Sequence, residues 1–161
     1  MPIAPNNLSA AIELASQQYF RLLILAGLPK VGKTAALQRT AAQRQCGIIN
    51  VNLELSQRML EMTRNQRARH AERLLREIIS ETSGDIVLLD NLEILFDPEL
   101  ELEPLRLLQL SSRNRTLVVS WNGSFDDDTL TYAEPGHPEF QQVKHPDALV
   151  FCLTTQRSAA G

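Results

Sequence analysis

Short runs of consecutive apolar residues recur along the chain and predict buried strands. The first run, Leu22–Ala26, contains no polar residue. An unbroken apolar run is typical of a strand covered on both faces, whereas a half-exposed strand alternates with a period of two. Similar runs follow at 48–53, 86–89, 117–121 and 148–153. The pattern therefore predicts about five strands.

The segments between these runs have the apolar spacing of amphipathic helices. The predicted helices are Ser9–Tyr19, Thr34–Gln45, Ser56–Ser80 with a break near Asn65, and Glu103–Ser111. Strands that alternate with helices indicate an α/β fold with three layers, in which helices cover both faces of a mostly parallel sheet. No repeat or linker divides the chain, so residues 1–161 are expected to form one domain.

Composition agrees with a globular protein that needs no disulfide: 43% of the 161 residues are hydrophobic and 22% are charged. The net charge of −3 argues against a surface devoted to polyanions. Cys46 and Cys152 match no metal-ligand spacing, which favours reduced thiols. The longest apolar run is far below the ~20 residues of a membrane span, and no basic segment opens a signal peptide. We expect a soluble, cytoplasmic protein without a membrane segment.

The loop after the first run has the pattern G-x-x-x-x-G-K-T, between a predicted strand and a predicted helix. Its residues are Gly27, Leu28, Pro29, Lys30, Val31, Gly32, Lys33 and Thr34. This pattern in this context is typical of a phosphate-binding loop, whose N–H groups surround a phosphate at the positive end of a helix. We expect both glycines to adopt backbone angles that a Cβ disfavours. Lys33 would reach the β- and γ-phosphates of ATP, and Thr34 would be a ligand of Mg²⁺.

Lys30 occupies a position where glycine is usual in such loops. Its side chain is either solvated or an added contact to phosphate or to a neighbouring subunit.

The run 86–89 is followed by Asp90, where an acidic residue holds Mg²⁺ through water in P-loop ATPases. In ATPases of the additional-strand class the next residue is usually a glutamate that polarises the attacking water. Here it is Asn91, whose amide cannot accept a proton. Glu93 either supplies the missing carboxylate or begins a solvated helix.

Two further sites complete the predicted catalytic set. Asn122 follows the fourth run, and we interpret it either as a polar sensor of the γ-phosphate or as part of an Asn-Gly turn. Arg113 and Arg115 precede that run, and they either complement the end of a helix or act on nucleotide in a neighbouring subunit.

Arginines concentrate on one face of the predicted helix within Arg64–Arg76, the chain's main basic patch. The face is either a salt-bridged surface or a contact for DNA or a partner.

Beyond the nucleotide motifs, four segments resemble the BrxF family, the small P-loop proteins of type III BREX phage-defence systems. The segments are 49–58, 89–100, 112–121 and, most specifically, the run Tyr-Ala-Glu-Pro-Gly-His-Pro-Glu-Phe at 132–140. The resemblance covers nearly the whole chain. It implies work beside a DNA adenine methyltransferase, a phosphatase-like protein and a larger ATPase in recognising or blocking phage DNA.

Three functions remain open: an ATP-dependent switch subunit with slow or partner-dependent hydrolysis, a small-molecule P-loop kinase with Arg64–Arg76 as its lid, and an assembly factor that binds ATP without hydrolysis. The tail Thr154–Gly161 is too short for a helical lid over adenine. We therefore expect either a modest affinity for the nucleotide or closure of the site by another subunit, in a homo-oligomer or a hetero-complex.

Overall fold

The computed structural model describes residues 7–153. The predictions about the first six residues and about the tail Thr154–Gly161 lie outside the described residues.

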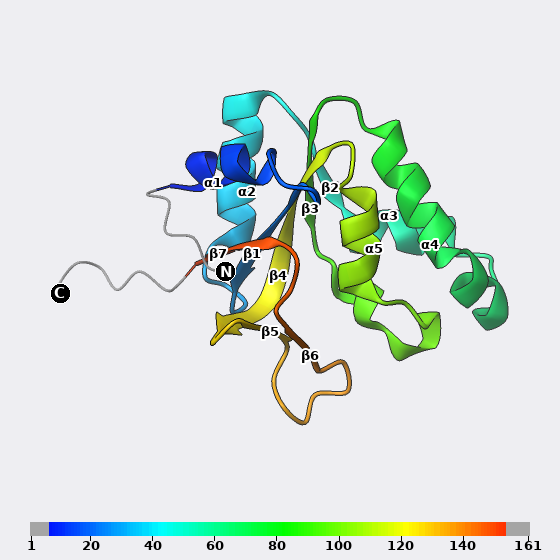
Figure 1. The fold of residues 1–161 in the computed structure, drawn as a ribbon. Coiled ribbons are helices and arrows are strands. Elements are labelled where there is room, and N and C mark those ends of the chain that lie inside the picture. Colours follow the sequence, from blue (N-terminus) through cyan, green and yellow to red (C-terminus); the bar gives the residue numbers. More distant parts are fainter. Residues whose placement is uncertain (1–6, 154–161) are drawn as a thin grey trace.

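A parallel sheet forms the centre of the molecule (Figure 1). Its strand order is β2-β3-β4-β1-β7, and every neighbouring pair in this order is parallel. The strands are β1 (Leu22–Gly27), β2 (Ile48–Asn50), β3 (Ile86–Asp90), β4 (Thr116–Asp126) and β7 (Leu149–Cys152). Because β4 lies between β1 and β3, the sheet has the strand order of the additional-strand class.

Helices cover both faces of the sheet, as Figure 1 shows. One face carries α1 (Leu8–Ala15) and α2 (Lys33–Arg44), and the other carries α3 (Val51–Arg58), α4 (Arg64–Glu81) and α5 (Pro104–Ser111). Successive residues of β1 alternate between the two apolar cores: Leu22 and Ile24 pack toward α3–α5, whereas Leu23 and Leu25 pack toward α1 and α2. The prediction of a three-layer α/β fold is confirmed.

The second apolar run is only half strand, contrary to the prediction. β2 ends at Asn50, whose side-chain oxygen accepts a hydrogen bond from the N–H of Leu53 at 3.1 Å and thereby caps α3. The predicted break near Asn65 is confirmed, because α3 ends at Arg58 and α4 starts anew after Thr63. Thr63 and Gln66 form a reciprocal capping box there.

The fourth strand is longer than predicted. β4 continues beyond the parallel sheet and pairs antiparallel with β5 (Thr129–Tyr132), which pairs with β6 (Gln141–Lys144). Asn122-Gly123 is therefore not a turn, and that interpretation is wrong. Gly123 lies inside β4. It must be glycine, because a Cβ there would come within 1.7 Å of the Thr131 carbonyl oxygen.

Two short 3₁₀ helices, η1 (Glu93–Phe96) and η2 (Pro98–Leu100), follow β3. The loop 133–140 between β5 and β6 projects at the end of the sheet where β1, β3 and the parallel part of β4 finish (Figure 1). Both features therefore lie at the carboxyl edge, where parallel α/β sheets bind ligands.

Candidate nucleotide-binding site

The loop 27–32 joins β1 to α2 at this carboxyl edge. Gly32 has φ 104°, a left-handed conformation that favours glycine, as predicted. Gly27 is glycine for a different reason. A Cβ there would lie 2.6 Å from Val31 Cγ2 and 2.9 Å from the Leu153 carbonyl oxygen, so the residue is required by close packing and not by a positive φ.

Lys33 lies on the first turn of α2 and is 6% exposed. Its Nζ donates hydrogen bonds to the carbonyl oxygens of Gly27 at 2.6 Å and Leu28 at 2.7 Å. Burial lowers the pKa of Lys33, while the nearby carboxylates Asp90 and Glu93 oppose that shift. The ammonium group is thus held inside the loop that would receive a phosphate.

Asp90 ends β3 and is buried between two hydroxyl donors. Thr34 Oγ1 donates to Asp90 Oδ2 at 2.8 Å, and Ser120 Oγ donates to Asp90 Oδ1 at 2.7 Å. The sequence predicted that Thr34 and Asp90 act together, and the structure brings them into contact. The sequence analysis did not predict a role for Ser120. The available signal was a single hydroxyl residue near the end of an otherwise apolar run, on the strand beside Asp90.

Asn91 has a left-handed backbone with φ 56°. Its N–H donates to Asp90 Oδ1 at 3.0 Å, and its carbonyl oxygen accepts from the N–H of Asn52 at 2.9 Å. Asparagine tolerates this conformation better than most residues do. Asn91, at the position where a glutamate is usual, therefore suits the left-handed backbone conformation found there.

Glu93 begins η1 and is half-buried. Burial raises the pKa of its carboxyl, and the charge of Asp90 raises it further, against an opposing effect of Lys33. A carboxylate with a raised pKa is a stronger base than an ordinary glutamate.

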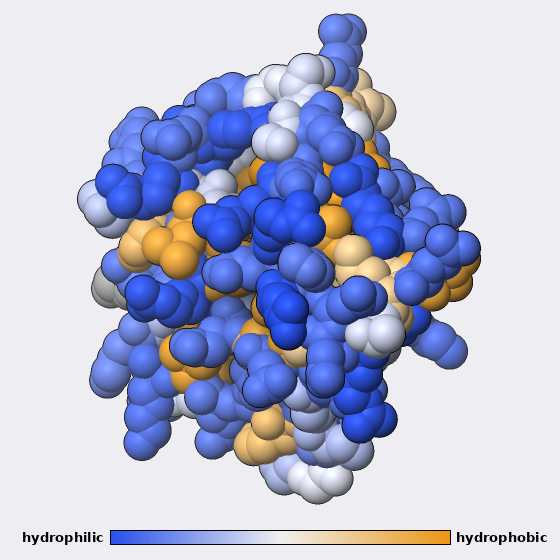
Figure 2. All heavy atoms as spheres, turned by 90° about the vertical axis from the view of Figure 1, so that its right-hand side faces the viewer, coloured by the Kyte–Doolittle hydropathy of each residue, from blue (hydrophilic) through white to orange (hydrophobic). Residues whose placement is uncertain are grey.

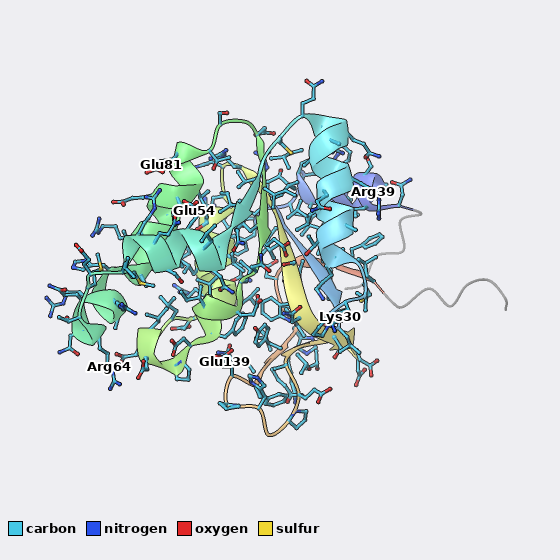
Figure 3. The ribbon with its side chains drawn as sticks, turned by 180° about the vertical axis from the view of Figure 1, so that it is seen from behind. Lys30, Arg39, Glu54, Arg64, Glu81 and Glu139 are labelled. Atoms are coloured by element: carbon cyan, nitrogen blue, oxygen red, sulfur yellow. The ribbon has the colours of Figure 1, made fainter. Side chains whose placement is uncertain are left out.

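These side chains surround one cavity of about 320 Å³. Its lining residues come from the loop, the end of β3, η1 and β4: Pro29, Lys30, Gly32, Lys33, Thr34, Asp90, Asn91, Glu93, Ser120 and Asn122. Lys30 is exposed at its rim with φ 70°, and Figure 3 shows it at the same end of the sheet as the loop 133–140. A backbone in this left-handed region explains why glycine is usual at that position.

The strand order, the loop between β1 and α2, and Asp90 beside Thr34 together decide the fold. The chain has the fold of a P-loop NTPase core. No family model and no curated protein sequence matches it. Among solved structures, this P-loop chain is similar to a DNA replication initiation factor, with 14% identity, 94% of this chain and 47% of that chain covered, and a TM-score of 0.46. It is also similar to AMPPCP-bound DnaA from Aquifex aeolicus, with 16% identity, coverage of 91% and 43%, and a TM-score of 0.45. The chain spans less than half the length of these two proteins.

Arg113 and Arg115 lie at the opposite, amino-terminal end of β4, and neither lines the nucleotide cavity. The Arg115 guanidinium donates to the carbonyl oxygens of Ile79 at 2.7 Å, Thr82 at 2.5 Å and Gly84 at 2.9 Å. Arg113 lies 4.2 Å from the centre of the Tyr19 ring. Within one chain these arginines therefore hold the end of α4 and an aromatic ring, and action on a neighbouring subunit stays a prediction.

α4, which carries the basic face within Arg64–Arg76, lies on the right in Figure 1, and Figure 2 shows that this side of the molecule is mostly hydrophilic. Arg64 pairs with Glu99 at 2.7 Å, Arg73 with Glu77 at 2.7 Å, and Arg76 with Glu72 at 4.0 Å. None of these arginines lines the nucleotide cavity, so α4 is not a lid over it in this structure. DNA contact through this face stays a prediction.

None of the helices within residues 7–153 is long and apolar enough to cross a membrane.

Proposed function

We propose that this P-loop chain binds Mg²⁺–ATP and hydrolyses it slowly, as a nucleotide-dependent switch. The observation that supports this most directly is the convergence of Lys33, Thr34 and Asp90 in one cavity at the carboxyl edge of the sheet. Lysine, hydroxyl and carboxylate are the groups that P-loop NTPases use for phosphate and magnesium.

Binding requires Lys33 to exchange partners. Its Nζ would leave the carbonyl oxygens of Gly27 and Leu28 and donate to the β- and γ-phosphates instead. Gly32, Lys33 and Thr34 at the start of α2 line the same cavity, and the free N–H groups in the first turn of a helix favour an anion.

The oxygens of Thr34 and Asp90 fit Mg²⁺, which prefers hard oxygen ligands and keeps several positions for water and phosphate. Thr34 would release Asp90 and turn its hydroxyl oxygen toward the ion. When bound, the ion neutralises charge on the phosphates. Ser120 keeps the Asp90 carboxylate oriented throughout, because it holds the oxygen that Thr34 does not contact.

Glu93 lines the cavity and would accept a proton from an attacking water. Asn91 cannot do so, and Asn122 lines the cavity where its amide could orient that water. Because Glu93 stands two residues beyond the usual position of the base, we expect hydrolysis to be slow in the isolated protein.

We further propose that this switch belongs to a BREX anti-phage complex in the cytoplasm. The resemblance of the segments 49–58, 89–100, 112–121 and 132–140 to the BrxF family supports this. Its partners would be the larger ATPase, the phosphatase-like protein and the DNA methyltransferase, in a homo-oligomer or a hetero-complex.

The test is calorimetry of Mg²⁺–ATP binding, followed by turnover measured alone, with DNA and with the BREX partners. Lys33→Ala should weaken binding by about 10- to 100-fold, since charge-assisted hydrogen bonds to phosphate are lost. Lys144→Ala is the matched control, because it removes an exposed lysine that does not line the nucleotide cavity and should change affinity by less than about 3-fold. Equal affinity of wild type and Lys33→Ala would refute nucleotide binding at this loop. Binding without turnover under every condition would refute hydrolysis and leave an assembly factor.

A further inference from the structure

A second cavity of about 490 Å³ adjoins the nucleotide cavity. The two share Pro29, Glu93 and Asn122, so the second cavity opens beside the predicted γ-phosphate position. Its outer wall is the loop between β5 and β6, which holds Glu139. Figure 3 shows Glu139 on this loop, at the same end of the molecule as Lys30.

The walls combine apolar surface with negative charge. Leu28, Pro29 and Pro135 provide apolar side chains, while Glu93, Glu134 and Glu139 provide carboxylates. No lysine or arginine is among the lining residues within 7–153. His137 is engaged in the loop itself, because its Nδ1 accepts the N–H of Glu139 at 3.0 Å. The cavity wall is therefore acidic, and of its three carboxylates Glu93 also interacts with Lys33 of the adjoining cavity.

Tyr132 also lines this cavity, and it is only 4% exposed. Its ring stacks on Phe96 with a centroid distance of 3.4 Å and meets Trp121 edge-on at 5.6 Å. Its hydroxyl makes no hydrogen bond to any residue between 7 and 153. The hydroxyl oxygen itself is not enclosed, so the cavity is the space from which a hydrogen-bond partner can come.

We propose that this cavity binds a small organic cation, an amine or guanidinium on a short apolar body. The Tyr132 hydroxyl would accept a hydrogen bond from the cation, and the carboxylates of Glu93 and Glu139 would balance its charge. The apolar body would cover Leu28 and Pro135. An anionic ligand would meet three carboxylates and no lysine or arginine among the described lining residues.

Its position beside Glu93 makes the cation a regulator of the neighbouring site. A cation there also attracts the γ-phosphate, so each ligand should tighten the other's binding by the same factor. This coupling rests on the proposed nucleotide function, whereas occupancy of the cavity does not.

The protein carries a reporter for this cavity, since Trp121 is its single tryptophan and contacts Tyr132. We would titrate n-butylguanidinium without nucleotide and follow Trp121 fluorescence, with n-butanol and n-butyrate as probes of the same chain length. A saturable change at millimolar guanidinium, absent for both controls, is expected. An equal response to butanol would overturn the proposal in favour of a purely apolar pocket.

Two conservative variants locate the binding. Tyr132→Phe keeps the stack on Phe96 and should weaken guanidinium affinity about 3- to 10-fold. Glu139→Gln keeps the size of this half-buried side chain and should weaken guanidinium affinity about 10-fold. Glu61→Gln, at an exposed position that does not line the cavity, should leave the affinity unchanged. Unaltered affinity in Glu139→Gln would overturn the site even if Tyr132→Phe failed to fold. A fluorescence change that follows protein concentration without any probe would also overturn it, because a second copy would then be the occupant.

Lys33→Ala separates the two proposals. It should retain guanidinium binding and lose the coupling to ATP. If wild type bound guanidinium but did not bind ATP, only the proposed nucleotide function would be refuted.

Discussion

The left-handed backbone of Asn91 leads to a quantitative prediction about its replacement. Asn91→Gln lengthens the side chain by one methylene and keeps the amide, but it removes the tolerance that asparagine has for φ 56°. A left-handed conformation costs an ordinary L-residue roughly 1–2 kcal/mol, of which asparagine avoids a part. We therefore expect Asn91→Gln to lower the free energy of unfolding by about 1 kcal/mol. In a domain of this size that corresponds to a fall in Tm of about 2–4 °C.

The matched control is Asn65→Gln, the same chemical change in a right-handed backbone. Asn65 is exposed on α4, where glutamine has the better helix propensity, so stability should be unchanged or slightly higher. Asn91→Glu should be less stable than Asn91→Gln, because its charge adds repulsion from Asp90 and Glu93. Asn91→Glu should nevertheless raise ATP turnover of the folded protein if the rest of the site is assembled.

Urea unfolding followed through Trp121, which is 2% exposed, measures these differences directly. If Asn91→Gln and Asn65→Gln were equally stable, the backbone explanation for Asn91 would be wrong. If Asn91→Glu also left turnover unchanged, the missing carboxylate would not be what limits hydrolysis.

Two further predictions concern the predicted catalytic residues. Glu93→Gln should lower ATP turnover by ~10²- to 10⁴-fold. In wild type the rate should rise with pH along an acid limb whose midpoint lies above 4.5, because burial raises the pKa of Glu93 and the basic form accumulates only above it. The variant should lack that limb. Because the pKa of Glu93 is raised in the folded protein, the folded state loses stability as pH rises through that pKa and the carboxyl becomes charged. Glu93→Gln should therefore be at least as stable as wild type at neutral pH. A destabilised variant, or full turnover in it, would contradict this role. Arg115→Ala should destabilise by about 2 kcal/mol through its lost bonds at the end of α4, and Arg113→Ala by less than about 1 kcal/mol. Thermal melts of both variants measure the structural role. Turnover of each variant mixed with Lys33→Ala subunits, under conditions where subunits exchange, tests a role in trans, and recovered activity would support a shared site. Unaltered turnover in Arg115→Ala alone would exclude a role in trans for Arg115.

The sequence predicted the sheet and the phosphate-binding loop because these depend on local patterns. An unbroken apolar run such as Leu22–Ala26 must be covered on both faces, and glycines next to Lys33 and Thr34 have few other uses. The placement of Asp90 followed from the same reasoning, since a residue directly after a buried strand lies at the edge of the sheet.

The parts that were missed depend on contacts between distant segments. Ser120 looks like one polar residue in an apolar run until β4 is placed beside β3. Asn122-Gly123 has the local signal of a turn, but the pairing of Gly123 with Tyr132 overrides it. The apolar residues after Asn50 suit a strand or a helix equally, and the cap that Asn50 provides decides for the helix.

The ends of the sheet have a consequence for how copies or partners can assemble. Among the described residues, the outer strands β2, β6 and β7 are only three or four residues long. A strand from another chain would find few unpaired N–H and C=O groups along any of them, which disfavours edge-to-edge polymerisation. Association of this protein is accordingly expected to use side chains on its helices and loops, so that partner choice can be altered by surface substitutions without disturbing the backbone pairing that holds the fold.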